Sequence, residues 1–167
     1  MRTFGIVGLS GNGKTTLVVK LVPQLVKMGL RVSTMKHAHH GFDLDTPGKD
    51  SYRHREAGAT EVMMSSSARW VLQHELRDEP ETTLEELLAR MTPVDLVIIE
   101  GFKAYPHPKI EVYRPSVGKE PLYPTDPHIV AVASDEDLKG LAVPVLDVDD
   151  AAAIADFIIA HCRLEAA

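Results

Sequence analysis

A glycine-rich run near the start of the chain has the residue types that bind phosphate groups. The stretch Gly8-Leu9-Ser10-Gly11-Asn12-Gly13-Lys14-Thr15 fits the pattern G-x-x-x-x-G-K-[ST]. Glycines let successive backbone N–H groups turn toward phosphate oxygens, while Lys14 adds positive charge at the β and γ phosphates. The Thr15 hydroxyl can ligate Mg²⁺. The run therefore predicts a phosphate loop for a nucleoside triphosphate.

A carboxylate at the end of an apolar run is the second candidate functional group. Asp95–Glu100 reads DLVIIE, and its Val and Ile residues are typical of a central parallel strand covered on both faces. Glu100 should then lie at the carboxyl edge of the sheet, beside the phosphate loop. There it could ligate magnesium, directly or through water, or polarise an attacking water, so we assign catalytic roles to Glu100 and Lys14. The alternative is a strand-end carboxylate that faces solvent.

Histidines and aspartates cluster in the segment KHAHHGFDLD, which contains His37, His39, His40, Asp43 and Asp45. These side chains have the right chemistry for a transition metal, but in an extended segment at most two of the histidines lie together. A role toward a substrate or in the magnesium shell, and a solvated loop, are the other two interpretations. Of the two aspartates, we choose Asp45 as the one that approaches Mg²⁺.

A basic cluster follows at Lys49, Arg53, His54 and Arg55. Lys49 and Arg53 are four residues apart and share a helix face, which would make a local anion site. The alternative is a solvated charged face paired with Glu56.

The elements that must position these residues alternate between strands and helices. A helix after the phosphate loop shows apolar residues at helical spacing, Asp50 and Asp150 can cap two later helices, and Thr82 with Glu85 fits a capping box for a third. This order predicts one α/β domain over residues 1–167, a P-loop NTPase-like fold with a mostly parallel sheet flanked by helices. Strands are expected at 3–7, 30–35, 61–65, 69–74, 95–100, 109–113, 128–133 and 144–148, and helices at 14–28, 51–57, 82–91 and 150–163.

Prolines mark the segment between two of the later strands. Six of the eleven prolines lie in Tyr105–Pro127, which predicts an irregular, proline-rich arm. The arm is too long for a tight connection and needs a surface to pack on, which favours a homodimer.

Composition and charge exclude several classes of protein. The chain has 167 residues, 44% of them apolar and 25% charged, as in globular proteins that fold around a core. A net charge of −6 argues against a nucleic-acid binder, and no apolar run is long enough to cross a membrane. The single cysteine, Cys162, excludes an intrachain disulfide, and the start of the chain lacks a secretory pattern, so we expect a cytoplasmic protein.

Several segments together resemble the MobB family, molybdopterin-guanine dinucleotide biosynthesis protein B. The resemblance covers about residues 3–135 and rests on GLSGNGKTTL, KHAHHGFDLDTPGKDSYRHREAGA, SSSARW, LVIIEGFK, PKIEVYR and DPHIVAVASD. It implies a homodimeric P-loop protein that binds GTP and Mg²⁺, hydrolyses GTP slowly at most, and acts as an accessory protein. Its implied partner is MobA, the transferase that joins GMP to molybdopterin, with molybdopterin as a further candidate. By this resemblance the residues from Gly8 to Thr16 bind the phosphates, and Glu100 lies near magnesium. With the patterns above, the predicted nucleotide-binding residues are Gly8, Ser10, Gly11, Asn12, Gly13, Lys14, Thr15 and Thr16, and the predicted metal ligands are Thr15, Glu100 and Asp45.

The chain lacks the N-K-x-D motif that usually recognises guanine, and we predict that Asp135 takes over this role. Asp135 follows the apolar run Ile129–Ala133, and its carboxylate can accept from the two adjacent donors of guanine.

Two other functions compete with the accessory role. One is a small-molecule kinase whose acceptor is gripped by the cluster Lys49–Arg55, and the other is a metal-insertion GTPase that uses His37–His40.

Overall fold

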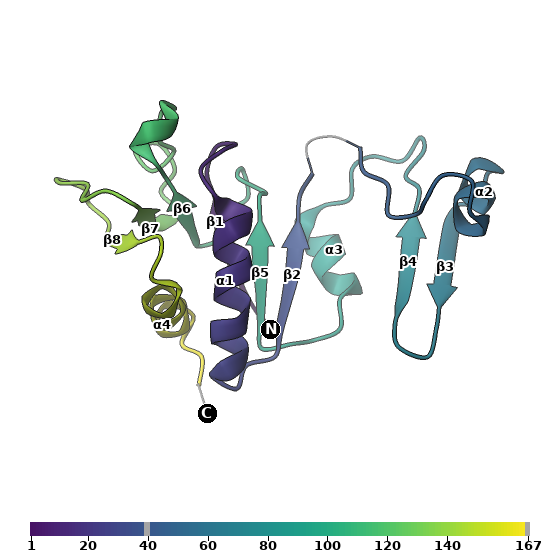
Figure 1. Cartoon of the computed structure of the whole chain (residues 1–167), viewed down its shortest axis with the longest axis horizontal. Helices are drawn as coiled ribbons and strands as arrows, with labels where there is room; N and C mark the ends of the chain where they lie inside the picture. Colours follow the sequence, from purple (N-terminus) through teal and green to yellow (C-terminus); the bar gives the residue numbers. More distant parts are fainter. Residues whose placement is uncertain (39–40, 166–167) are drawn as a thin grey trace. The chain divides into compact units, whose positions relative to one another are not determined.

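A six-stranded parallel sheet forms the core of one of the two units into which the chain divides (Figure 1). The structure, a computed structural model, describes residues 1–38 and 41–165. The unit with the sheet comprises Met1–His37 and Met91–Ala167. Its strands, in the spatial order β2-β5-β1-β6-β7-β8, are β2 (Val32–Lys36), β5 (Leu96–Glu100), β1 (Arg2–Val7), β6 (Lys109–Val112), β7 (Ile129–Ser134) and β8 (Val145–Asp147). The predicted α/β class with a parallel sheet is confirmed.

Strand β5 lies between β1 and β2 and is buried along its whole length. Glu100 is in register with Ile6 of β1 and Lys36 of β2. The apolar run LVII suits this interior position, as the sequence predicted. Because the three strands are parallel, their carboxyl ends meet at one edge of the sheet.

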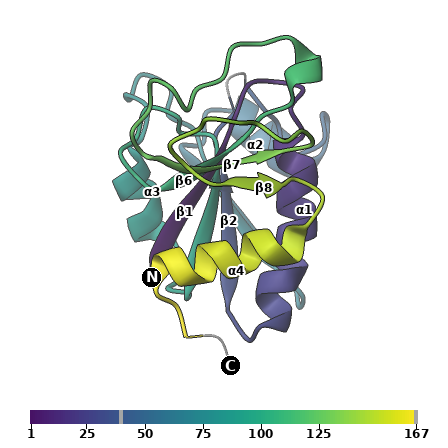
Figure 2. The same cartoon turned by 90° about the vertical axis from the view of Figure 1, so that its left-hand side faces the viewer.

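Two helices, α1 (Lys14–Lys27) and α4 (Ala151–Cys162), pack on one face of this sheet (Figure 2). The apolar stripe of α1 and the apolar face of α4 meet alternate strand residues such as Phe4 and Ile98 in one buried cluster. The Asp150 side chain accepts a hydrogen bond from the Ala153 N–H at 2.9 Å, which confirms the predicted cap of α4. Within the described ranges, no helix is long and apolar enough to cross a membrane. The cytoplasmic location stays a prediction.

The proline-rich arm, Tyr105–Pro127, is fixed at its base by a buried lysine. Lys109 on β6 is fully buried, and its ammonium donates to the carbonyl oxygens of Lys103 and Tyr105 at 2.8 and 2.7 Å and to Asp126 at 3.1 Å. Three acceptors match the three donors of an ammonium group. Lys109 therefore ties both ends of the arm to the sheet.

A buried glutamate on the same strand also fixes the base of the arm, on the side that returns to the sheet. The Glu111 carboxylate accepts from the N–H groups of Leu122 and Tyr123 at 2.8 Å each. Leu122 and Tyr123 then pack on a second apolar cluster that contains Val7 and Val132. The arm thus finds its packing surface inside its own chain, so its length carries no argument for a dimer.

The second unit, Ala38–Arg90, contains a hairpin and two short helices. The hairpin pairs β3 (Glu61–Ser65) with β4 (Trp70–His74) in antiparallel register, and α2 (Asp50–Glu56) and α3 (Leu84–Arg90) are the helices. The single domain over residues 1–167 stays a prediction.

Two helix caps in this unit differ from the sequence-based prediction. Asp50 is the first residue of α2, whose cap is Lys49 without a side-chain bond, so the predicted Asp50 cap is wrong. The capping box of α3 uses Thr83 and Glu86, one residue later than expected. Both threonines have a glutamate three residues on, and spacing alone cannot choose between them.

Candidate functional site

The phosphate loop connects β1 to α1, as its pattern requires. Gly8 begins the loop at φ 136°, and a Cβ atom there would lie 2.3 Å from the Val112 carbonyl oxygen of the neighbouring strand. Only glycine fits this position. The loop brings together all the predicted phosphate-binding residues, Gly8, Ser10, Gly11, Asn12, Gly13, Lys14, Thr15 and Thr16, at the N-terminus of α1, where the helix dipole favours anions.

Lys14 is half-buried at the beginning of α1, and its ammonium donates to the Leu9 carbonyl oxygen at 3.2 Å. Burial lowers the pKa of Lys14, as do the positive charges of Lys103, Lys36 and Lys119, while the negative charge of Glu100 opposes the shift. Lysines therefore gather at this loop although the chain as a whole is acidic. Such a local excess of positive charge suits a polyphosphate.

Thr15 and Glu100, which are 85 residues apart in sequence, meet in the structure. The Thr15 hydroxyl donates to Glu100 Oε1 at 2.7 Å, and the Lys36 ammonium lies 3.3 Å from the same carboxylate oxygen. Lys36 also donates to the Thr15 hydroxyl at 3.4 Å. The sequence analysis paired Thr15 with Glu100 correctly but missed Lys36. Its position at the end of a predicted strand was the available signal.

The hydroxyl of Thr15 and the carboxylate of Glu100 are the hard oxygen ligands that magnesium prefers. Magnesium at a nucleotide needs only one or two protein ligands, because waters and phosphates supply the others. No group of three His, Cys, Asp or Glu residues suited to a metal occurs among residues 1–38 and 41–165. Thr15 and Glu100 therefore fit a magnesium ion that is bound together with a nucleotide.

The chain turns sharply after Glu100. Gly101 has φ 101°, and a Cβ atom there would lie 2.9 Å from the Cβ of His37. The Gly101 N–H donates to the Ile6 carbonyl oxygen at 3.2 Å, and the Phe102 ring stacks on His37 at 4.5 Å. These contacts hold the end of β5, and with it Glu100, against β1 and β2. Of the predicted histidine block, His39 and His40 lie outside the described residues.

Arg114, which the sequence analysis missed, links the phosphate loop to Asp135. Its backbone N–H donates to the Asn12 side-chain oxygen at 2.8 Å, and its Nε donates to the Asn12 carbonyl oxygen at 3.3 Å. Its Nη1 donates to a carboxylate oxygen of Asp135. Asp135 does follow a strand, β7, as predicted, and it lines an open pocket of about 310 Å³ with Glu136, Asp137 and Asp147. Its role as the reader of guanine stays a prediction.

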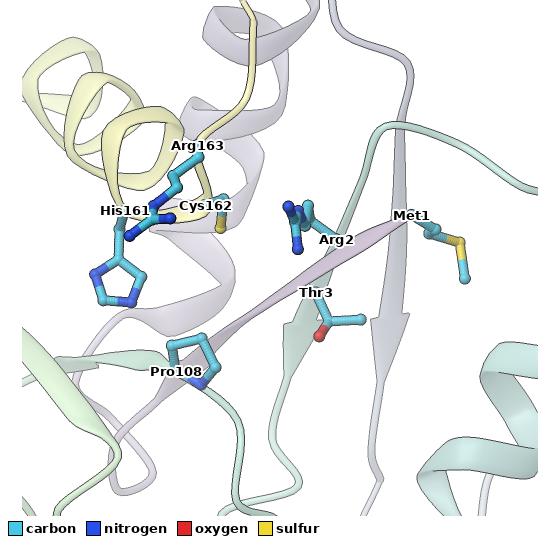
Figure 3. A pocket seen from close by; sticks show the side chains of 7 residues that line it. All are labelled: Met1, Arg2, Thr3, Pro108, His161, Cys162 and Arg163. Atoms are coloured by element: carbon cyan, nitrogen blue, oxygen red, sulfur yellow. The ribbon is translucent and has the colours of Figure 1, made fainter.

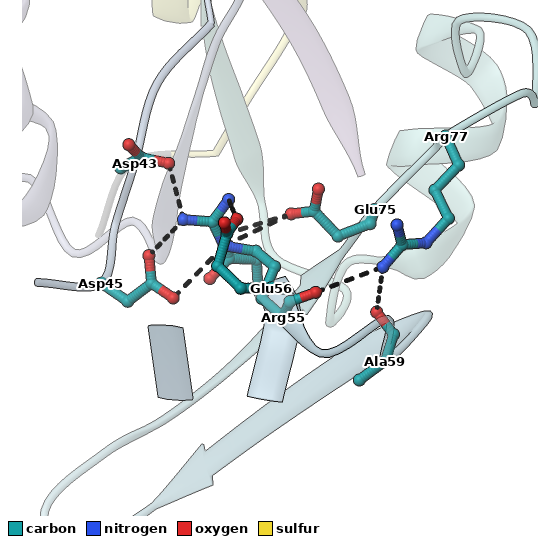
Figure 4. A network of polar contacts seen from close by, with 8 residues as sticks. Asp43, Asp45, Arg55, Glu56, Ala59, Glu75 and Arg77 are labelled. Carbon is teal, nitrogen blue, oxygen red and sulfur yellow. Dashed lines mark hydrogen bonds and ion pairs between the residues drawn. The ribbon is translucent and has the colours of Figure 1, made fainter. Parts of the chain in front are cut away.

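Asp45 belongs to the second unit and is engaged by Arg55 (Figure 4). Arg55 donates to both Asp45 carboxylate oxygens, at 3.3 and 3.0 Å, and to Asp43 at 2.9 Å. The Asp45 side chain is fully buried. A role as a magnesium ligand stays a prediction, and it would require Asp45 to share its oxygens with a guanidinium. Arg55, in turn, donates to carboxylates, while the anion site of Lys49 and Arg53 and the kinase interpretation stay predictions.

A second open pocket, of about 510 Å³, lies at the opposite end of β1 from the phosphate loop (Figure 3). It is lined by Arg2, His161, Cys162 and Arg163 together with Met1, Thr3 and Pro108. None of the predicted nucleotide or metal residues lines it.

Comparisons with known proteins agree with this geometry. The family model for molybdopterin guanine dinucleotide synthesis protein B, MobB, matches residues 3–135. The molybdopterin-guanine dinucleotide biosynthesis adapter protein of Escherichia coli is 44% identical over 153 residues, covering 90% of this chain and 87% of that protein. The protein of the same name from Haemophilus influenzae is 41% identical, covering 92% and 85%. The crystal structure of a MobB protein homolog from Bacillus stearothermophilus is 28% identical, with a TM-score of 0.69, covering 98% and 99%.

Proposed function

Because the chain belongs to the molybdopterin guanine dinucleotide synthesis protein B (MobB) family, we propose that it is a GTP-binding adapter in molybdopterin-guanine dinucleotide biosynthesis. In this role it assists a MobA-type transferase that joins GMP to molybdopterin. Two of its relatives, from Escherichia coli and Haemophilus influenzae, are named as adapter proteins of molybdopterin-guanine dinucleotide biosynthesis, and the match covers most of their length.

The observation that carries the proposal is the cluster formed by Lys14, Thr15, Glu100 and Lys36 at the carboxyl edge of the sheet. Lys14 and the loop N–H groups bind the phosphates, and Thr15 with Glu100 would hold the magnesium ion. When bound, that ion neutralises charge on the phosphate oxygens. Glu100 holds the Thr15 hydroxyl in place toward this position.

We expect this protein to hydrolyse GTP slowly at most, because of the contacts that Glu100 makes. Its carboxylate accepts from Thr15 at 2.7 Å and lies 3.3 Å from the Lys36 ammonium, and both contacts are made by Oε1. A carboxylate oxygen already engaged within the protein is not free to take a proton from an attacking water. Binding that outlasts hydrolysis suits an adapter, which must stay in one nucleotide state while it engages a partner.

We also propose a homodimer, now on the basis of the hairpin in the second unit. Met63 and Leu72 face each other across the hairpin, with Trp70 on the same face, and all three side chains are exposed. A two-stranded hairpin with an uncovered apolar face is only marginally stable on its own. Light scattering should give the mass of a dimer, and Trp70→Ser with Met63→Ser should shift it to a monomer. A parent protein that is monomeric at micromolar concentration would contradict the homodimer.

The adapter role is tested by measuring guanine dinucleotide formation by a MobA-type enzyme, with and without this protein and GTP. We expect the protein to raise the yield, and we expect Lys14→Ala to abolish the increase while the variant stays folded. Lys139→Ala is the matched control, because the Lys139 side chain is 87% exposed and lies outside the site. Equal yields with and without the parent protein would contradict the proposal.

A further inference from the structure

The proline-rich arm returns to the phosphate loop through the segment from Arg114 to Lys119. A Cβ atom on Gly11 would lie 3.6 Å from Val117 of this segment, and the Lys119 ammonium donates to the Ser10 carbonyl oxygen at 2.9 Å. Together with the bonds from Arg114 to Asn12, these contacts run along three consecutive residues of the loop, Ser10 to Asn12. The segment is therefore one wall of the phosphate site.

The two cations of this wall are held in different ways. Arg114 makes two bonds to Asn12, which is only 1% exposed, and a further one to Asp135. The backbone N–H makes one of the bonds to Asn12, whereas the guanidinium makes the other, to the Asn12 carbonyl oxygen, and is also paired with the Asp135 carboxylate, so moving the cation would break both of its bonds. Lys119 is exposed and makes one bond, to a neutral carbonyl oxygen. Lys119 can therefore change partner at little cost, whereas Arg114 stays as a brace.

The position of Lys119 relative to Lys14 indicates what its other partner would be. Lys14 donates to the Leu9 carbonyl oxygen at 3.2 Å and Lys119 donates to the next one, that of Ser10, at 2.9 Å, so the two ammonium groups are bound at adjacent residues of the loop. A phosphate loop lysine contacts the β and γ phosphates. The two ammonium groups repel each other, but a phosphate bound by Lys14 would attract both of them.

We propose that Lys119 senses the terminal phosphate of a nucleoside triphosphate: its ammonium leaves the Ser10 carbonyl oxygen, binds a γ-phosphate oxygen, and draws the arm onto the site. This inference rests on the proposed nucleotide-binding function. Lys119 would distinguish a nucleoside triphosphate from a diphosphate, and the position of the arm would differ between the two bound states. The arm is suited to this, because Lys109 and Glu111 fix its base while its tip is exposed.

The test compares the affinities for Mg²⁺–GTP and Mg²⁺–GDP by calorimetry in the full chain. Lys119→Gln can still donate to the Ser10 carbonyl oxygen but lacks the charge, so we expect GTP affinity to fall about tenfold. GDP affinity should stay within about twofold, because an exposed charge contributes little without a nearby partner. Lys119→Arg should keep the preference of the parent protein for GTP.

Lys139→Gln is the matched control, since it removes one exposed lysine charge away from the loop, and it should leave both affinities unchanged. An unchanged GTP-to-GDP ratio in Lys119→Gln would overturn the sensing role. If the parent protein binds no GTP, or if Lys14→Ala binds as tightly as the parent, the proposed function itself fails. If Lys14→Ala loses binding but Lys119→Gln keeps the ratio, only the inference about Lys119 fails.

Discussion

Two regions each combine a lysine with a glutamate but use them differently: the mouth of the phosphate loop, with Lys14 and Glu100, and the base of the arm, with Lys109 and Glu111. At the base, Lys109 is fully buried, and each of its three donors has an acceptor within the chain. At the mouth, Lys14 is half-buried and donates to one carbonyl oxygen, at 3.2 Å. A buried lysine with all its hydrogen bonds made stabilises the fold, whereas a lysine with donors left over can bind a ligand.

The two carboxylates, Glu111 and Glu100, differ in the same way as the two lysines. Glu111 at the base accepts from backbone N–H groups and is 1% exposed, while Glu100 at the mouth accepts from a threonine hydroxyl and forms an ion pair with an exposed lysine. Backbone partners cannot leave without unfolding the strand or the arm. Side-chain partners at a surface can be exchanged for a ligand or a metal ion.

Lys109→Met should have the largest effect and should act on stability alone. It leaves the Asp126 carboxylate and two carbonyl oxygens without their cation, which costs about 3–5 kcal/mol of unfolding free energy. Urea denaturation measures this value, with Lys139→Met as the exposed control that should change it little. A loss equal to that of the control would remove the distinction between base and mouth.

Lys14→Ala should show the reverse pattern. Loss of a charge-assisted contact to phosphate costs about 1.5–3 kcal/mol, or about 10- to 150-fold in GTP affinity. Because the ammonium of Lys14 makes a single hydrogen bond to the residues that the structure describes, we expect the urea midpoint to stay close to that of the parent. Calorimetry and urea denaturation on the same sample check both expectations. A variant that loses stability but keeps GTP affinity would assign Lys14 to the fold.

Glu100→Gln should have a smaller effect, confined to turnover. The substitution keeps the shape and removes the charge, so slow GTP hydrolysis should fall about tenfold while binding survives. Phosphate release under single-turnover conditions measures the rate. Thr15→Ala should instead weaken binding in the presence of magnesium and leave binding in EDTA unchanged. Equal hydrolysis by Glu100→Gln and the parent would place Glu100 among the structural residues.

The smallest expected effect is a pH dependence at the base of the arm. Burial raises the pKa of Glu111, although its hydrogen bonds to Leu122 and Tyr123 oppose the shift. A carboxyl group whose pKa is higher in the folded state disfavours folding once it is ionised. Its contribution to stability is therefore lost as the pH rises from the unfolded pKa of about 4.5 through the folded pKa. Unfolding free energies at several pH values should fall less steeply in Glu111→Gln than in the parent.

Local patterns in the sequence predicted the mouth but missed the base. The spacing of Gly8, Gly13, Lys14 and Thr15 encodes a loop between a strand and a helix, and the run ending at Glu100 encodes a buried strand, so both ends of the site were predictable. Lys36 came next to them only through the register of β2 with β5. No local pattern encodes that register.

The proline-rich arm shows more clearly which contacts a sequence pattern cannot predict. Lys109 and Glu111 alternate with apolar residues in KIEV, which reads as a half-exposed strand, yet the structure buries both faces. Their partners, such as Asp126 and Leu122, lie 11 to 17 residues away in a segment with little regular structure. The sequence therefore predicted an arm without a packing surface and, from it, a dimer. Tertiary contacts supplied the surface instead.

Hydrogen exchange with and without Mg²⁺–GTP tests the central claim most directly, because it locates the nucleotide in the full chain. We predict slower exchange of the backbone amides in residues 8–16, which are proposed to bind phosphate, and little change in residues 109–112, whose amides are already bonded in the sheet. The same protection should be absent in Lys14→Ala. Protection confined to other segments, or none at saturating GTP, would contradict the assignment of the phosphate loop as the nucleotide site.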